Sequence, residues 1–269
     1  MTLFRRNPFG HLLFIKRWLI RILGSLTYRR YNGFNELKID GSEFIRDLPA
    51  TNVLFISNHQ TYFADVVAMF HVFNASLHGR NDSISNLGYL WNPKLNIYYV
   101  AAKETMSAGI LPKILSYVGS VSVERTWRAQ GKDVTEKKAV NPNDTENIGI
   151  ALNDGWLITF PQGTTKSFKP VRKGTAHIIK TYKPIVVPIV IDGFRRSFDK
   201  KGLRLKKKGI LQTFTIKEPL IIDYENSTID EIVEQVEYAI EQHQSFLKVI
   251  PSEEIEAQEE LNKFRRWEY

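Results

Sequence analysis

The chain contains no cysteine among its 269 residues, and this absence removes three kinds of chemistry at once. It excludes disulfide bonds, thiolate nucleophiles and zinc sites built on cysteine, and it is consistent with a reducing compartment. The six histidines do not supply the missing ligands, because no two of them form a His-Glu-x-x-His pair on one helix. We therefore expect neither a protein-held metal nor a cofactor.

Acidic residues are missing from the first part of the chain, where the first one is Glu36. Basic residues are frequent there and are interleaved with leucine, isoleucine and aromatic residues such as Trp18. Arg17 and Arg21 follow helical spacing and form a narrow basic stripe beside a wide apolar surface. This pattern is typical of an interfacial helix, so residues 1–35 are predicted to bind an anionic membrane surface. The alternative is an ordinary amphipathic helix docked on the core.

The same segment lacks an apolar run long enough to cross a membrane. Lys16, Arg17 and Arg21 interrupt the ~20 apolar residues that a crossing needs. The segment also lacks the small-residue cleavage site of a signal peptide. We therefore expect a peripheral protein on the cytoplasmic face of the membrane.

The whole chain is basic, with 37 Lys and Arg against 29 Asp and Glu and a formal net charge of +8. This balance favours an anionic partner, which could be nucleic acid, an acidic membrane or a phosphorylated substrate. Nucleic acid is not expected, because the sequence has no RNA-binding signature with aromatic residues on a sheet. A second basic cluster at 200–208 is interpreted as a solvated loop, with attraction of membrane or substrate as the alternative.

Strand and helix patterns alternate over residues 36–250, and no repeat or low-complexity linker interrupts them. This order predicts one α/β domain with a mixed central sheet flanked by helices. Residues 251–269 are predicted to form a charged, helical C-terminal tail. Helices are expected at 42–48, 65–73, 110–118, 145–153, around 177–179 and after 227–228, with a polar loop at 74–93. Strands are expected at 36–40, 53–56, 98–102, 120–123, 156–160, 185–191, 213–216 and 220–222.

The first candidate site follows the apolar strand at 53–56, where His59 and Asp65 come within a few residues of its end. The carboxyl end of a strand is where α/β sheets place catalytic groups. A histidine held by a carboxylate can take the proton from an alcohol as it attacks a carbonyl, which suggests acyl transfer. The alternative is a helix capped by Asn58 or Thr61 with a histidine that has no chemical role.

Three later segments also lie at the ends of expected strands. The segment 119–125 ends in Arg125, whose forked guanidinium suits a phosphate group. The segment 160–166 reads Phe-Pro-Gln-Gly-Thr-Thr-Lys, and its proline and glycine predict a tight turn that presents N–H groups and hydroxyls to an anion. The segment 187–191 is an apolar strand close to the predicted site.

Together the four segments resemble the glycerolipid acyltransferase superfamily, which includes the 1-acylglycerol-3-phosphate acyltransferases. The family motifs read approximately Asn-His-x-x-x-x-Asp, Gly-x-x-Phe-x-x-Arg, Phe-Pro-Glu-Gly-Thr-Arg and Val-x-Pro-Val, and the resemblance covers residues 41–194. It implies transfer of a fatty acyl group from a thioester of coenzyme A or acyl carrier protein to a lysolipid acceptor. It also implies that His59 is the general base and that Asp65 orients it. Substrate binding is implied for Asn58, Arg125, Gln162, Gly163, Thr164, Thr165 and Lys166.

The sequence departs from the family pattern in three places. Asp65 lies one residue further from His59 than is usual, which on a regular helix would rotate it by about 100°. A turn before the helix or a single-turn bulge could absorb the extra residue. Gln162 and Thr165 replace the usual Glu and Arg, so two charges near the acceptor are gone, and Ser122 stands where Phe is usual.

These departures leave three hypotheses open. The first is an enzyme that makes phosphatidic acid from 1-acylglycerol-3-phosphate. The second is an O-acyltransferase for a lyso-aminolipid or another acceptor without a phosphate, which the missing charges favour. The third is a catalytically silent membrane-binding protein, which the position of Asp65 supports. A serine hydrolase is not expected, because the chain has no Gly-x-Ser-x-Gly elbow.

Overall fold

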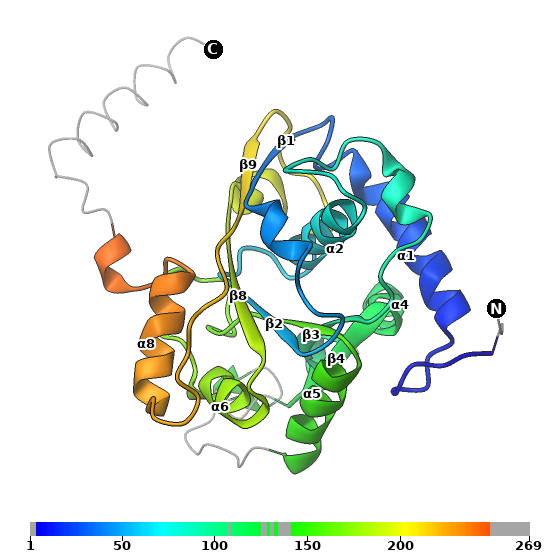
Figure 1. Cartoon of the computed structure of the whole chain (residues 1–269). Coiled ribbons are helices and arrows are strands. Elements are labelled where there is room, and N and C mark those ends of the chain that lie inside the picture. The colour runs from blue at the N-terminus through cyan, green and yellow to red at the C-terminus, as the bar shows by residue number, and fades with distance from the viewer. Residues whose placement is uncertain (1–3, 107–108, 125–127, 130–131, 134–140, 248–269) are drawn as a thin grey trace, which may run out of the picture.

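The computed structural model describes residues 4–106, 109–124, 128–129, 132–133 and 141–247. Its centre is a seven-stranded sheet with the order β1-β9-β8-β2-β7-β3-β4 (Figure 1). The strands are β1 (Glu36–Asp40), β2 (Val53–Ser57), β3 (Ile97–Ala102), β4 (Ser120–Val123), β7 (Trp156–Thr159), β8 (Ile185–Asp192) and β9 (Leu211–Ile216). A separate antiparallel pair consists of β5 (Arg128–Ala129) and β6 (Lys132–Asp133).

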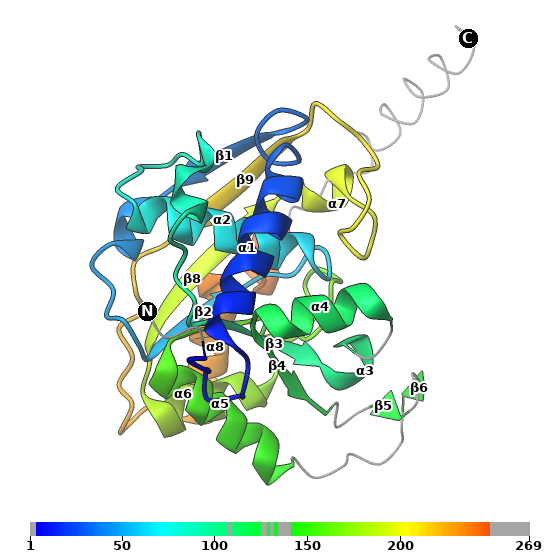
Figure 2. The same ribbon diagram turned by 90° about the vertical axis from the view of Figure 1, so that its right-hand side faces the viewer.

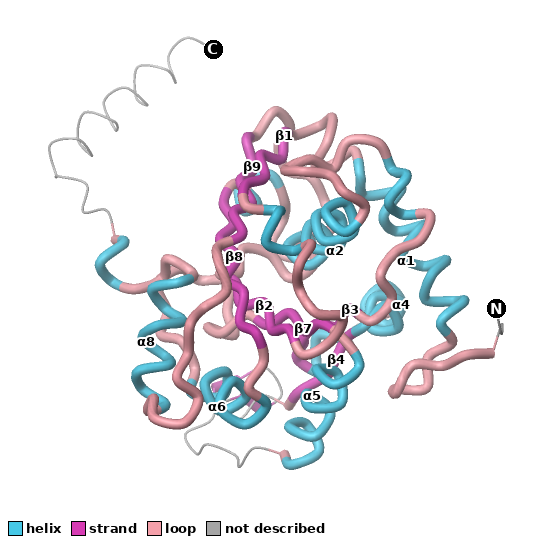
Figure 3. The backbone as a smooth tube through the Cα atoms, in the orientation of Figure 1, coloured by secondary structure: helices cyan, strands magenta, loops and turns pink. Residues whose placement is uncertain are grey.

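The sheet is mixed, as predicted. Strands β8, β2, β7, β3 and β4 run parallel to one another, and β9 pairs antiparallel with β8. Strand β1 then pairs parallel with β9. Because parallel strands end at the same edge of a sheet, the residues that follow β2, β3, β4 and β7 lie along one edge. The tube in Figure 3 shows β2 between β8 and β7 in the middle of the sheet.

Helices cover both faces of the sheet (Figures 1 and 2). Alternate residues of β2 pack against the helices on opposite faces of the sheet. Phe55 packs on Phe73 on one face, and Leu54 belongs to the core on the other face. This alternation follows from the two-residue period of a strand. The first layer contains α1 (Leu13–Tyr28), α2 (Ala64–Leu77) and α4 (Ile110–Gly119), and the second contains α5 (Pro142–Asp154), α6 (Lys173–Tyr182) and α8 (Ile229–Ala239).

Short elements complete the described part of the chain, and several sequence predictions need correction there. The prediction of a strand at 220–222 is wrong, since the structure has no strand there. A ladder between β8 and this segment would need the N–H groups that Pro188 and Pro219 lack. The predicted helix at 42–48 is only a 3-10 turn, and the predicted loop at 74–93 contains the end of α2. The short elements are α3 (Lys103–Met106), α7 (Phe194–Ser197), η1 (Ser42–Ile45), η2 (Leu87–Leu90) and η3 (Gln244–Phe246).

The predicted N-terminal helix is present as α1, and its inner face docks on the core. Ile20 is buried, and Lys16, counted above with the basic residues of this segment, is also fully buried. The Lys16 ammonium donates to the Ile97 carbonyl at 3.3 Å and lies over the Tyr98 ring, and burial lowers its pKa to about 7. Within the described residues, no helix has both the length and the apolar character that a membrane crossing requires. The predicted tail at 251–269 lies outside the described residues.

Candidate active site

His59 and Asp65 meet in the turn that connects β2 to α2. Strand β2 ends at Ser57 and α2 begins at Ala64, so Asp65 belongs to the first turn of the helix. His59 Nδ1 lies 2.9 Å from Asp65 Oδ2. The carboxylate is fully buried, and the histidine side chain keeps 13% of its surface exposed. The sequence-predicted pair therefore forms in spite of the longer spacing.

The turn at 60–63 absorbs the extra residue. Its backbone curls around the carboxylate, which accepts the Gln60 N–H at 2.7 Å and the Thr61 N–H at 3.0 Å. The Thr61 hydroxyl donates to the other carboxylate oxygen at 2.7 Å. These donors stabilise the buried negative charge of Asp65, because a buried carboxylate needs hydrogen-bond partners. Of the two explanations that the sequence left open, the structure has the turn rather than a helix bulge.

The contact fixes which nitrogen of His59 can act as a base. A carboxylate only accepts hydrogen bonds when ionised, so Asp65 favours the tautomer with the proton on Nδ1. The other nitrogen, Nε2, then carries the lone pair that can accept a proton. The ring of Phe160 stacks on the His59 ring with centroids 3.9 Å apart and restricts its rotation. The residue types in the third motif predicted a turn, and they gave no indication of this stacking.

His59 opens into a cavity of about 270 Å³ at the carboxyl edge of the sheet. The turn after β7 lines one side of it with Gly163, Thr164, Thr165 and Lys166. The last residues of β3 line another side, together with Tyr62 and Lys200. The structure thus brings His59 and four of the predicted substrate-binding residues to one cavity.

The turn of the third motif depends on its glycine. The Gly163 N–H donates to the Phe160 carbonyl at 2.9 Å, which closes the turn. Gly163 has a φ of 61°, and a Cβ atom there would lie 2.7 Å from Nε of Arg172. Both observations favour glycine at this position, because other residues are strained at positive φ. Gln162, in contrast, is buried beneath the turn, where its amide donates to the Lys169 carbonyl and to Gln242.

Two other predicted residues are placed differently. The side chain of Asn58 donates to the Ile191 carbonyl at 2.8 Å and accepts the Ile191 N–H at 2.9 Å. These bonds attach the His59 turn to β8, and Asn58 is not among the residues that line the cavity. Arg125 lies outside the described residues, so its predicted contact with a head group stays a prediction.

Arg195, in α7 directly after β8, is a residue that the sequence analysis did not identify. Its N–H donates to the Gln60 side chain at 3.1 Å, and its guanidinium donates to the His59 carbonyl at 3.2 Å. The same guanidinium donates to the Ser167 hydroxyl at 2.6 Å and to the Thr165 carbonyl. Arg195 thus connects the His59 turn to the turn of the third motif. No sequence pattern could have indicated this, because the contacts join segments far apart in the chain.

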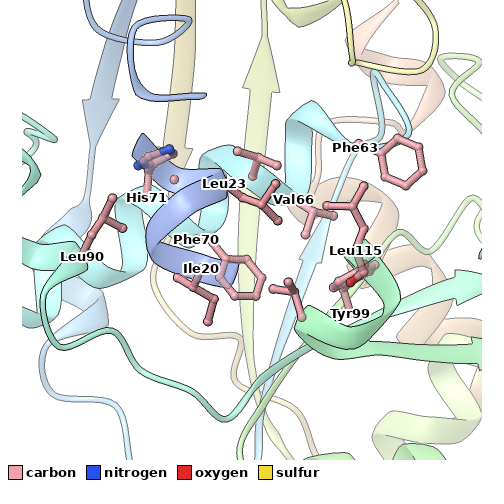
Figure 4. Close-up of a pocket in the computed structure, with 12 residues that line it drawn as sticks. Ile20, Leu23, Phe63, Val66, Phe70, His71, Leu90, Tyr99 and Leu115 are labelled. Atoms are coloured by element: carbon pink, nitrogen blue, oxygen red, sulfur yellow. The ribbon is translucent and has the colours of Figure 1, made fainter. Parts of the chain in front are cut away.

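A second, smaller cavity of about 50 Å³ lies beneath α1, in the layer that contains α1, α2 and α4 (Figure 4). Its lining is apolar apart from His71, and Ile20 and Leu23 of α1 contribute to it. Val66 and Tyr99 line both this cavity and the one that contains His59. These two side chains are therefore shared by the walls of both cavities.

Comparisons with known proteins identify a family and a similar fold. A family model described as Acyltransferase matches residues 36–192. Among solved structures, the chain is similar to the 1-acyl-sn-glycerophosphate (LPA) acyltransferase PlsC from Thermotoga maritima, with a TM-score of 0.53 and 17% sequence identity. This match covers 89% of the present chain and 81% of the other, and it shows that the two folds are alike. The comparison with curated protein sequences finds no match.

Proposed function

Because this chain belongs to the Acyltransferase family, we propose that it moves a fatty acyl group from an acyl thioester to the hydroxyl of a lysoglycerolipid. The proposed acceptor is 1-acylglycerol-3-phosphate and the product is phosphatidic acid. The donor is a thioester of coenzyme A or of acyl carrier protein. The observation that carries the proposal is the 2.9 Å contact between His59 and Asp65 at the wall of the cavity. The activity named for the similar T. maritima protein supports the acceptor.

In the proposed reaction, Nε2 of His59 accepts the proton of the acceptor hydroxyl as its oxygen attacks the thioester carbonyl. The tetrahedral intermediate then collapses, the carbon–sulfur bond breaks, and the leaving thiolate takes the proton back from His59. Asp65 holds the imidazole and stabilises its positive charge. The turn with Gly163 and Thr164 lines the same cavity and is proposed to bind the polar part of the substrate.

A second acceptor class remains in competition with the phosphate-bearing one. Gln162 and Thr165 lack the charges that the family pattern has in the third motif, and this favours a lyso-aminolipid or another acceptor without a phosphate. The catalytically silent alternative loses its main support, because Asp65 contacts His59 despite the longer spacing. The acceptor therefore has to be identified by assay.

The deciding experiment uses the purified chain with an acyl thioester and a panel of lysolipids. Release of the free thiol and formation of the diacyl lipid are followed together, and His59→Ala serves as the control without a base. Rapid turnover of 1-acylglycerol-3-phosphate supports the phosphatidic acid proposal, and preference for a lyso-aminolipid replaces it with the second acceptor class. Absence of transfer to every lysolipid in the panel leaves only the silent alternative.

We also propose that the outer face of α1 binds an anionic membrane surface and keeps the protein peripheral, on the cytoplasmic face. The guanidinium of Arg21 lies between the rings of Trp18 and Trp91, at 5.1 and 4.8 Å from their centroids. Aromatic and basic side chains together suit the interface of an anionic bilayer. The exposed apolar residues of this surface are Phe14, Ile15, Trp18, Ile22 and Leu26 on α1, and Trp91 after η2.

The membrane proposal is tested in the full chain, since removal of α1 would uncover the cavity that Ile20 and Leu23 line. Trp18→Ser with Trp91→Ser should reduce sedimentation with vesicles that contain an anionic phospholipid. Ile185→Ser, at an exposed apolar residue on β8, serves as the control. Equal sedimentation of both variants and the wild type would refute the membrane role.

A further inference from the structure

The turn at 199–204 packs directly against the His59 turn. The carbonyl of Lys200 accepts the Tyr62 N–H at 3.2 Å, and the carbonyl of Lys201 accepts the Phe63 N–H at 3.0 Å. Gly202 has a φ of 75°, and a Cβ atom there would lie 2.5 Å from the Ala64 nitrogen. The two turns are therefore in backbone contact, with no space between them for a side chain at residue 202.

The turn is also fixed internally, so the position of Lys200 relative to His59 is defined. The Asp199 carboxylate accepts the N–H groups of Leu203 at 2.8 Å and of Arg204 at 3.0 Å. The guanidinium of Arg30, just after α1, donates to the Leu203 carbonyl at 2.8 Å. These bonds fix the turn against the site, although its lysines are exposed, as the interpretation of a solvated loop predicts.

The Lys200 side chain lines the His59 cavity, with its ammonium 5.9 Å from the centroid of the Tyr62 ring. Lys166 lines the same cavity from the turn of the third motif. No carboxylate is among the described residues that line this cavity, and neither lysine forms an ion pair within the described part of the chain. The described residues that line the cavity thus include two lysines, while the Asp65 carboxylate is buried behind His59.

We infer that Lys200 and Lys166 together form a subsite for the phosphate group of a substrate. The inference rests on the proposed acyl transfer and narrows it to a phosphorylated substrate at the His59 cavity. Two ammonium groups from separate turns can donate charge-assisted hydrogen bonds to phosphate oxygens. They supply positive charge that the third motif lacks at Thr165. The same chemistry could serve the head group of the acceptor or the phosphates of the donor's pantetheine arm, and the acceptor is the expected ligand.

The test compares Lys200→Gln with Lys201→Gln in the full chain. Both changes remove one exposed lysine from the same turn, but only Lys200 lines the cavity. Lys200→Gln should raise the KM for 1-acylglycerol-3-phosphate by about 10- to 100-fold, the range for one charge-assisted hydrogen bond, with little change in kcat. Lys201→Gln should stay within about twofold of the wild type, since Lys201 does not line the cavity. Lys200→Arg should recover most of the loss.

The remaining measurements identify the source of the phosphate. The KM for monoacylglycerol, which has no phosphate, should not change in Lys200→Gln. A rise in the KM for the acyl thioester instead would keep the subsite and assign it to the donor. Equal KM values for both substrates in Lys200→Gln and wild type would overturn the inference.

A binding measurement separates this inference from the proposed reaction, because it needs no turnover. Glycerol 3-phosphate is added to the wild type and to each variant, and its phosphorus NMR line width is followed. Broadening by the wild type and by Lys201→Gln, with loss of broadening in Lys200→Gln, supports the subsite even if no lysolipid is acylated. Equal broadening by both variants refutes the subsite even if acyl transfer is observed.

Discussion

The turn before α2 and the middle of α2 each contain a histidine bonded through Nδ1, and the two histidines differ in their partners and in their exposure. His59 contacts the Asp65 carboxylate, and its side chain reaches the larger cavity. His71 lies under α1, where Nδ1 is 2.7 Å from the Tyr89 hydroxyl and Nε2 is 3.1 Å from the Thr27 hydroxyl. Burial lowers the pKa of His71 to about 4.

The difference separates a histidine that is suited to act as a base from one that is not. His71 has neutral partners at both nitrogens and is 1% exposed, so it is held in the neutral form and cannot reach a substrate. His59 has a charged partner at one nitrogen, and its side chain remains partly exposed to a cavity. A general base needs a carboxylate at one ring nitrogen and access to the substrate at the other. Of these two histidines, only His59 has both.

The strongest test of this comparison is to remove each histidine. His59→Ala should lower kcat by ~10²–10⁴-fold, the usual cost of losing a general base, while the far-ultraviolet circular dichroism stays unchanged. His71→Gln should leave kcat within a few-fold of the wild type, because His71 is buried and does not line the cavity of His59. Retention of full activity in His59→Ala would contradict its role as a base.

The second test concerns the partner that distinguishes His59. Asp65→Asn should lower kcat by ~10–10³-fold, less than His59→Ala, because the amide can no longer favour the proton on Nδ1. The amide also places its own donors against the N–H groups of Gln60 and Thr61, so the midpoint of thermal unfolding should fall. Thr61→Val is the matched control, since it removes one hydrogen bond to Asp65 and leaves the contact with His59. Wild-type kcat in Asp65→Asn would show that another group orients His59.

The sequence allowed the position of His59 to be predicted, but it did not settle whether His59 and Asp65 are in contact. An apolar run followed by polar residues is enough to predict β2 and to place His59 at its carboxyl end. The contact depends on the turn at 60–63, whose N–H groups point inward at the carboxylate. That arrangement is set by contacts with the turn at 199–204, which no local pattern contains.

Tertiary contacts also explain the other errors. A lysine is expected to be exposed because of its charge. Lys16 is buried instead, where its ammonium donates to the Ile97 carbonyl and lies over the Tyr98 ring. Strand β8, which is buried over most of its length, was predictable from its apolar run alone. The start of α8 was also predictable, because Thr228 and Glu231 form a capping box there. Arg195 was not predictable, because an arginine in a short helix has no distinguishing pattern until its partners are known.

The third test uses the low pKa of His71. The unfolded chain takes up a proton near the ordinary value of 6.5, whereas the folded chain does so only near 4. Between these values the unfolded state binds more protons, so the free energy of unfolding falls as the pH is lowered. Urea unfolding near pH 7 and near pH 5 should show a loss of about 2 kcal/mol from this group.

His71→Gln is the control for that measurement, because glutamine does not titrate in this range. The pKa of His11 is also lowered, by burial and by Lys16, and it adds a slope of the same sign. Since His11 is present in both proteins, the difference between wild type and variant isolates His71. Identical pH dependence in the two proteins would contradict the neutral, structural role assigned to His71.

The smallest expected effect concerns Arg195, which connects the His59 turn to the turn of the third motif. Its guanidinium donates to the His59 carbonyl, the Ser167 hydroxyl and the Thr165 carbonyl. A lysine keeps the charge but not the forked set of donors, so Arg195→Lys should lower kcat/KM by about tenfold, chiefly through kcat. Arg196→Lys is the matched control, since Arg196 is the next residue and its guanidinium bonds to Asp192 rather than to the two turns. If the two variants lose the same activity, Arg195 does not position the turns. If Arg195→Lys alone loses activity at an unchanged thermal midpoint, it acts as a positioning residue for His59.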